Sequence, residues 1–422
     1  MFTNINSMKK SFLFIVALMM TSISNAQTAY ITNSMDNTIS VIDVNTNTVT
    51  HTIHVGNTPI GVAVNLEGTK VYVANIRDST VSIINTATNT VSATVHVIAS
   101  EGIAVSPDGT KVYVANENST TVGTTVSLIN TSSNIISNII SVGSNPEGIT
   151  VSPNGSKVYV ANTNANTVSV INTATNSVLA TINVGINPEG ITIKPDGSKV
   201  YVSNNHGNSI SVINTTTNRV SSTITCNIGP WGMCVSLDGS KLYVANNDTS
   251  TISVINTITN AISNTISVGI NPIGLSISPD GSKVYVANNS DNTVSVVNTA
   301  TNTVSATIPV GHQPFAFGNF ISTYTQPAGI TTLNQEATIT LSPNPFTSET
   351  TITFSEEQTH TIIKVRNILG EEIKTFVISA ANQITLEKGT MQAGIYFLEI
   401  TDSGSASSPT RKNVVNKKVV VQ

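Results

Sequence analysis

A short tetrapeptide recurs seven times along the 422-residue chain, and its spacing limits the possible fold more than any other feature. Each copy reads Tyr, a β-branched apolar residue, a small residue and Asn. The copies are separated by 42, 41, 46, 42, 42 and 42 residues and begin at Tyr30, Tyr72, Tyr113, Tyr159, Tyr201, Tyr243 and Tyr285. A period of about 40–45 residues made of short strands is typical of β-propellers. We therefore expect one seven-bladed ring rather than several unrelated domains.

One repeat, residues 187–229, shows how a blade would be built. Pro195, Asp196 and Gly197 form a tight-turn sequence between two short apolar segments. Alternation of apolar and polar residues places every second side chain on the same face of a strand. We predict four antiparallel strands joined by hairpins, at residues 191–193, 199–203, 209–213 and 219–226.

The two ends of the repeat region predict how the ring closes. The first Tyr motif, at Tyr30, has no inner-strand sequence before it. Residues 314–321 begin like an inner strand, but no second strand follows them. We therefore expect residues 314–321 to supply the missing inner strand of the first blade, so that the propeller spans residues 27–321. Such closure removes the open sheet edges that would otherwise pair with other chains.

The N-terminal residues 1–26 have the pattern of a secretory signal peptide. Lys9 and Lys10 precede an apolar run over residues 12–20, and a small-residue cleavage site follows, between Ala26 and Gln27. A membrane anchor is the alternative, but the run is shorter than the roughly 20 residues that a spanning helix needs. No other stretch is apolar enough to cross a bilayer, so we predict an exported chain without a transmembrane segment after cleavage.

After Ile321 the repeat stops and the sequence changes character. Residues 322–336 are polar and contain Pro and Gly, as linkers do. We expect a small immunoglobulin-like β-sandwich over residues 337–422, with strands including residues 337–342, 350–354, 361–366, 395–400 and 419–421.

The repeats resemble a known family. Tyr-Val-Ala-Asn, Ser-Pro-Asp-Gly-Ser-Lys and Thr-Val-Ser-Val-Ile-Asn, in register over nearly all of residues 27–321, are similar to the YVTN β-propeller repeats of bacterial and archaeal surface and secreted proteins. Two departures are local. The third blade carries four extra residues within 117–125, and Ser100 replaces the Pro that opens the other inner strands.

The C-terminal residues also resemble a known domain. Four segments in order are similar to the C-terminal sorting domain of type IX secretion in Bacteroidota, and within them we single out Pro343, Asn344, Pro345, Gly370, Gly394 and Tyr396. The resemblance implies the type IX machinery as a partner and export across the outer membrane, usually with removal of this domain and release or surface attachment. An adhesive sandwich retained in the mature protein is the alternative.

Candidate binding residues follow the Pro or Ser that opens each inner strand. In a propeller these rim positions surround one end of the central channel; here they are Ile60, Glu101, Glu147, Glu189, Trp231, Ile273 and Phe315. One interpretation is that the three Glu residues, which come from consecutive blades, bind a cation or a hydroxyl-rich ligand. Trp231 and Phe315 would then stack on a sugar or peptide ring. The alternative is that the Glu residues are solvated turn residues about 10 Å apart, which repel by only about 0.4 kcal/mol per pair. Trp231 would then serve packing alone.

Other polar residues give weaker signals. The Asn that ends each Tyr motif lies at a strand end, where its side chain satisfies backbone and turn groups, so we predict a structural role. The six His residues recur at no fixed blade position, and the sequence predicts no catalytic residue, metal site or cofactor. Cys226 and Cys234 could form a disulfide in an exported chain, although their positions in different blades disfavour it.

Charge and export narrow the function classes. Residues 27–321 contain 9 Lys or Arg against 14 Asp or Glu, giving −5, so nucleic acid is a poor candidate partner. The preferred hypothesis is a non-enzymatic secreted or surface-attached propeller that binds an unknown extracellular protein or glycan through its loop face. The alternatives are a hydrolase or lactonase-like enzyme with a rim metal held by Glu101, Glu147 and Glu189, and a structural surface-layer component.

Overall fold

The computed structural model describes residues 27–98, 100–117, 123–226, 228–321, 340–358, 361–367, 372–378, 381–402 and 414–421. The chain divides into two compact units, residues 1–329 and 330–422, and each is described by itself. The predicted signal peptide, with Ala26, and the predicted linker over residues 322–336 lie outside the described residues.

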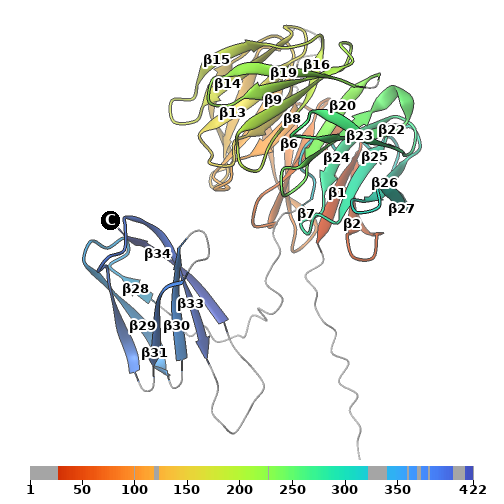
Figure 1. Cartoon of the computed structure of the whole chain (residues 1–422). Coiled ribbons are helices and arrows are strands. Elements are labelled where there is room, and N and C mark those ends of the chain that lie inside the picture. The colour runs from red at the N-terminus through yellow and green to blue at the C-terminus, as the bar shows by residue number, and fades with distance from the viewer. Residues whose placement is uncertain are drawn as a thin grey trace, which may run out of the picture. The chain divides into compact units, whose positions relative to one another are not determined.

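The described part of the first unit consists of seven antiparallel sheets in chain order, one with three strands and six with four. Blade 1 contains β1–β3, blade 2 contains β4–β7, and blades 3 to 7 follow in the same way to β27. Blade 1 (red, β1 and β2) lies beside blade 7 (blue-green, β24–β27), as a closed ring requires (Figure 1). The predicted seven-bladed propeller is confirmed.

The strands of the blades fall into four classes, counted outward from the central channel. The inner strands are β4(Pro59–Val64), β8(Ser100–Val105), β12(Pro146–Val151), β16(Pro188–Ile193), β20(Pro230–Val235) and β24(Pro272–Ile277). The second strands are β1(Thr28–Asn33), β5(Lys70–Asn75), β9(Lys111–Asn116), β13(Lys157–Asn162), β17(Lys199–Asn204), β21(Lys241–Asn246) and β25(Lys283–Asn288). A single 3₁₀ turn, η1(Asn247–Thr249), interrupts the described residues of blade 6.

The third and outer strands complete the blades. The third strands are β2(Thr38–Asp43), β6(Thr80–Asn85), β10(Thr125–Asn130), β14(Thr167–Asn172), β18(Ser209–Asn214), β22(Thr251–Asn256) and β26(Thr293–Asn298). The outer strands are β3(Thr48–His54), β7(Thr90–His96), β11(Ile135–Ser141), β15(Ser177–Asn183), β19(Arg219–Thr225), β23(Ala261–Ser267) and β27(Thr303–Pro309). In blade 5 the four predicted strands match β16–β19 closely.

Burial explains why the second strand carries the repeat's motif. The second and third strands are buried on both faces, whereas the outer strands alternate between exposed and partly buried residues. The seven motif Tyr side chains are at most 3% exposed. Apolar β-branched residues and Tyr therefore fill the layers between neighbouring sheets, where burial of apolar area stabilises the ring.

The repeated Asn satisfies polar groups inside each blade, as predicted. In blade 4 the Asn162 Nδ2 donates to Thr167 Oγ1 and to Ser169 Oγ, each at 3.0 Å. The corresponding Asn makes the same pair of bonds to the third strand in the other blades. Buried polar groups are costly unless they are paired, so this amide fixes the register of the two strands.

The Lys that follows the turn sequence joins neighbouring blades. Lys157 Nζ of blade 4 donates to the carbonyl of Thr215 in blade 5 at 2.7 Å. Equivalent bonds link the other blades from blade 2 onward. Lys283 Nζ of blade 7 donates to Val44 O of blade 1 at 2.7 Å and completes the series.

Residues 313–321 lie against β1, but they do not form a continuous strand. They pair with β1 at the isolated bridges Asn33–Pro314 and Ala29–Ile321. Between these bridges Ala316 and Gly318 have positive φ values of 50° and 127°. The chain therefore turns toward blade 2, where the Phe317 carbonyl accepts the Val62 N–H at 3.0 Å. This segment contacts the inner edges of blades 1 and 2, whereas the sequence predicted an inner strand of blade 1 alone.

The described part of the second unit is a two-sheet sandwich, as predicted. One sheet has the order β28(Thr340–Ser342), β29(Glu349–Gln358), β32(Ala381–Glu387). The other has the order β31(Glu372–Ile378), β30(Thr361–Asn367), β33(Gly394–Asp402), β34(Val414–Val421). Buried side chains from both sheets, such as Ile352 and Leu398, form its core.

Replacing the repeated Asn in one blade tests its structural role. Asn162→Ala removes one buried and one partly buried hydrogen bond and leaves two hydroxyls without their donor, so we expect a loss of about 1–3 kcal/mol in the free energy of unfolding. Urea denaturation measures this. The control is Asn183→Ala, an exposed Asn on β15 of the same blade, expected to change stability by less than about 0.5 kcal/mol. Equal effects of the two substitutions would contradict the assignment.

Candidate functional site

A close contact between neighbouring blades determines where the rim side chains point. The rim position of each inner strand is followed by Gly, and the Cα of that Gly abuts the next blade. A Cβ at Gly61 would lie 1.9 Å from the Glu101 carbonyl oxygen, and one at Gly102 would lie 1.9 Å from that of Glu147. Only Gly permits this approach. Because the rim residue's carbonyl faces the preceding blade, its side chain projects into the channel mouth.

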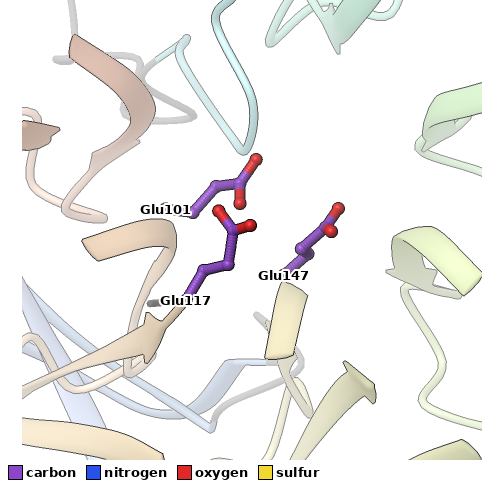
Figure 2. A group of neighbouring side chains, drawn as sticks. All are labelled: Glu101, Glu117 and Glu147. Carbon is purple, nitrogen blue, oxygen red and sulfur yellow. The ribbon is translucent and has the colours of Figure 1, made fainter. Parts of the chain in front are cut away.

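Four carboxylates gather on one arc of this mouth. Glu101, Glu147 and Glu189 come from the start of β8, β12 and β16, and only 7%, 8% and 7% of each residue is exposed. Glu117, which directly follows β9, reaches into the same place. One carboxylate oxygen from each of Glu101, Glu117 and Glu147 lies within 4.8 Å of the others. Figure 2 shows the three side chains converging from different strands on one open region.

This arrangement differs from the solvated carboxylates, about 10 Å apart, that were considered as an alternative from the sequence. Glu101 and Glu147 are both buried, and their nearest ligand oxygens are at most 4.8 Å apart. The physical reason is the Gly contact, which draws adjacent inner strands together at their rim ends. Repulsion between the carboxylates is correspondingly stronger than it would be in water.

Burial raises the pKa of each of the three rim carboxyls. For Glu101, burial is reinforced by a hydrogen bond shared with Glu117 and by the charges of Glu117 and Glu189, so its pKa lies well above the usual value. For Glu147, burial acts together with the charge of Glu101 and a hydrogen bond shared with Glu189. For Glu189, burial raises the pKa, and both the Glu147 hydrogen bond and the charge of His206 offset part of the rise. The arc therefore favours ligands that bring positive charge or hydrogen-bond donors.

Two Asn side chains orient the carboxylates in blades 4 and 5. Asn145 Nδ2 donates to Glu147 Oε1 at 2.9 Å, and Asn187 Nδ2 donates to Glu189 Oε1 at 3.0 Å. Both pairs belong to the same Asn-Pro-Glu sequence. Blade 3 has Ala-Ser-Glu instead, so Glu101 lacks this Asn, and its carboxylate lies beside that of Glu117.

Glu117 is the site residue that sequence reasoning missed. In blades 4, 5 and 7 the residue after the repeated Asn donates a hydrogen bond to the carbonyl of the Pro that opens the next inner segment; the donors are Thr163, Asn205 and Asn289. An ionised Glu cannot donate this bond. The sequence did contain a sign of this role: Glu117 is acidic where blades 4, 5 and 7 have Thr or Asn, and it lies beside the four-residue insertion of blade 3.

Aromatic side chains occupy the opposite arc of the mouth. The Trp231 and Phe315 rings meet edge to face with centroids 6.1 Å apart, and Phe315 makes a similar contact with Phe317 at 6.5 Å. Trp231 and Phe315 are partly exposed, whereas Phe317 is buried. The structure thus brings the two predicted aromatic residues together and adds Phe317, which the sequence did not single out.

The channel below the rim is a cavity of about 430 Å³. It begins at the layer of rim glycines and runs along the inner strands. Its wall is mixed: apolar side chains such as Ile103, Ile149 and Leu275 alternate with polar groups that include Thr150, Ser276 and Asn319. The rim groups therefore stand at the opening of a channel with both polar and apolar walls.

The predicted sorting residues lie in the second unit, apart from the rim residues. Asn344 Oδ1 accepts the Val420 N–H at 2.8 Å, between Pro343 and Pro345, and so fixes the last strand. The buried Tyr396 donates its hydroxyl to Gln392 O at 2.9 Å, and Gly394 pairs with Val421. Gly370 lies outside the described residues.

Cys226 and Cys234 are both buried and both free. They belong to different clusters of the core: Cys226 lies in the cluster between blades 5 and 6, while Cys234 lies in the cluster between blades 6 and 7. Burial raises the pKa of the Cys226 thiol to about 12, so it is a poor nucleophile at neutral pH.

Two families match parts of the chain. Residues 340–420 match the secretion system C-terminal sorting domain, which confirms the predicted sorting domain and type IX export to the cell surface or the medium. Residues 53–251 match the choice-of-anchor I domain, which fits association with the surface. The YVTN relationship stays a resemblance. No curated protein matches the chain.

Solved structures support the propeller fold. Hydrazine synthase of Kuenenia stuttgartiensis has 21% identity and a TM-score of 0.60, covering 65% of this chain and 93% of that one. A functionally unknown protein from Desulfotomaculum acetoxidans has 19% identity and a TM-score of 0.62, covering 70% and 98%. At such identities the likeness shows the fold alone. Among the described residues, no helix has the length and apolar character needed to cross a membrane.

The buried rim carboxyls predict an unusual pH dependence of stability. The pKa of Glu101 is higher in the folded protein than its ordinary value of 4.5, so the folded state binds more protons above pH 4.5. The free energy of unfolding should therefore fall as pH rises from 4.5 through the folded pKa. Glu101→Gln cannot ionise and should reduce this fall, as thermal melts from about pH 4.5 to about pH 8 in metal-free buffer would show.

A matched control is Glu67→Gln, in the exposed turn after β4. It should leave the slope of stability against pH unchanged. If the Glu101→Gln and wild-type curves ran parallel over this range, the carboxyl would not be held in the environment described here.

Proposed function

We propose that this chain is a non-enzymatic, exported propeller that binds a glycan at the rim of its central channel. The observation that carries the proposal is the division of one mouth into a carboxylate arc, Glu101, Glu117, Glu147 and Glu189, and an aromatic arc, Trp231, Phe315 and Phe317. Type IX export places the chain where extracellular polysaccharides are found.

The chemistry of the two arcs fits a sugar ring. A pyranose presents C–H groups on its face and hydroxyls around its edge. Partly exposed Trp231 and Phe315 offer apolar rings to the C–H face, and each carboxylate accepts hydrogen bonds from hydroxyls. A concave, mostly apolar site with a few convergent polar groups is the usual form of a small-ligand site.

The arrangement of the carboxylates favours binding over glycoside hydrolysis. Glycosidases place two carboxyl groups about 5 Å or more apart so that the scissile bond fits between them. Here oxygens of Glu101, Glu117 and Glu147 all lie within 4.8 Å of one another, which is closer than that spacing.

A second candidate function is a metal-dependent hydrolase of the lactonase-like kind. It is favoured by the grouping of oxygens from Glu101, Glu117 and Glu147 within 4.8 Å, since a bound cation could polarise a carbonyl there. Turnover of lactone or ester substrates that is lost in Glu147→Gln would establish this function. Absence of turnover with added Ca²⁺, Mg²⁺ and Zn²⁺ would leave the binding function.

Loss of the Trp231 ring tests the binding function. On a glycan array, the exported chain should bind a defined set of oligosaccharides, and Trp231→Ala should weaken that binding about tenfold, because loss of a stacked ring costs about 1.4 kcal/mol. Affinities for a selected oligosaccharide can be measured by calorimetry.

The matched control is Ile258→Ala, which truncates a side chain that is 83% exposed in the turn after β22, away from the rim. It should bind as the wild type does. Absence of glycan binding by a folded wild-type chain, or equal binding by Trp231→Ala, would contradict the proposed function.

A further inference from the structure

The distances within the carboxylate arc match those around a bound cation. Ca²⁺ lies about 2.3–2.6 Å from its oxygen ligands, so two ligand oxygens on one ion are at most about 5 Å apart. Oxygens of Glu101, Glu117 and Glu147 already lie within 4.8 Å of one another. All of them are carboxylate oxygens, a donor set that suits hard cations rather than Zn²⁺ or Cu²⁺.

Glu189 gives a second, independent indication of a ligand. Only 7% of this residue is exposed, and no amide, hydroxyl or cationic group of the described residues donates to its buried Oε2. Its other oxygen, Oε1, is held by Asn187, which fixes the carboxylate beside Glu147. A buried carboxylate oxygen without a donor is costly, and a cation in the arc would satisfy it.

The sequence of blade 3 departs from its neighbours in the way that a ligand site would require. At the position of Glu117, Thr163 and Asn205 of the following two blades donate hydrogen bonds that join adjacent blades. An ionised Glu117 cannot donate that hydrogen bond, and it adds a negative charge beside the buried carboxylates of Glu101 and Glu147. No Lys or Arg acts on the pKa of Glu101, Glu147 or Glu189 among the described residues. His206 offsets part of the pKa rise at Glu189 alone, so a cation bound in the arc would supply positive charge that the Lys and Arg residues do not.

We propose that Glu101, Glu117 and Glu147 bind a divalent cation at the channel mouth, with Glu189 as a further oxygen ligand, and that the cation is Ca²⁺. The inference deepens the proposed function and rests on it for its role, because hydroxyls of a glycan would complete the coordination of the ion. Cation binding itself depends only on the four carboxylates.

Calcium fits the arc better than magnesium does. Ca²⁺ accepts six to eight oxygens in irregular geometry and is commonly held by several carboxylates. Mg²⁺ requires near-ideal octahedral geometry and usually keeps several waters. Carboxylates distributed over three blades, two of them held by Asn145 and Asn187, cannot rearrange easily into an octahedron.

Calorimetry with CaCl₂ alone tests the site in the chelator-treated exported chain. The wild type should bind one equivalent of Ca²⁺, more tightly than Mg²⁺, and its melting temperature should rise with calcium. Glu117→Gln removes one charged ligand and should weaken calcium binding by at least about tenfold. Because this change also relieves repulsion between buried carboxylates, the variant should melt no lower than the wild type in chelator, which distinguishes a lost ligand from a lost fold.

The matched control is Glu67→Gln, at the opposite end of β4 from the rim, which should bind calcium as the wild type does. No calcium binding by the folded wild type at millimolar concentration, or unchanged binding by Glu117→Gln, would overturn the proposal. Trp231→Ala separates the two claims: it should keep calcium binding while losing glycan binding. Calcium binding without any glycan binding would refute the proposed function and leave the cation site standing.

Discussion

The contact between an inner-strand Gly and the carbonyl of the next blade is the constraint on which the mouth of this propeller depends. At Gly148 a Cβ would lie 2.2 Å from the Glu189 carbonyl oxygen, so no other residue permits the blades to approach so closely. The contact sets the width of the channel at its rim. It also orients the rim residues of blades 3 to 7, whose carbonyls it holds against the preceding blade.

Most of the ring repeats the same interactions, and the site is where the repeat is broken. The buried Asn, the motif Tyr and the Lys between blades recur with nearly the same distances from blade to blade. The rim positions differ, with carboxylates in blades 3 to 5 and Trp231 in blade 6. Glu117 and the Ala-Ser-Glu sequence belong to the blade with the insertion. A regular scaffold can hold such irregular residues because its stability comes from the repeated contacts.

The sequence predicted the blade number, the strand limits and the role of the repeated Asn, because each depends on local periodicity. It also identified Glu101, Glu147, Glu189, Trp231 and Phe315 as rim residues. It did not predict that the carboxylates are buried and adjacent, since this follows from the blade contacts. Glu117 and Phe317 were missed because neither follows the Pro or Ser that opens an inner strand: Glu117 directly follows β9, and Phe317 lies in the closing segment with positive φ at Ala316. In the sandwich, β31 and β32 were missed because polar residues interrupt their apolar pattern.

The central claim is that the carboxylate arc is a ligand site rather than a cluster that shares protons. An anomalous difference map from crystals of the exported chain grown with calcium tests this claim most directly. The account predicts a peak about 2.3–2.6 Å from oxygens of Glu101, Glu117 and Glu147, on the side of the mouth that faces Trp231. Carboxylates hydrogen-bonded only to one another, with no peak among them, would contradict it.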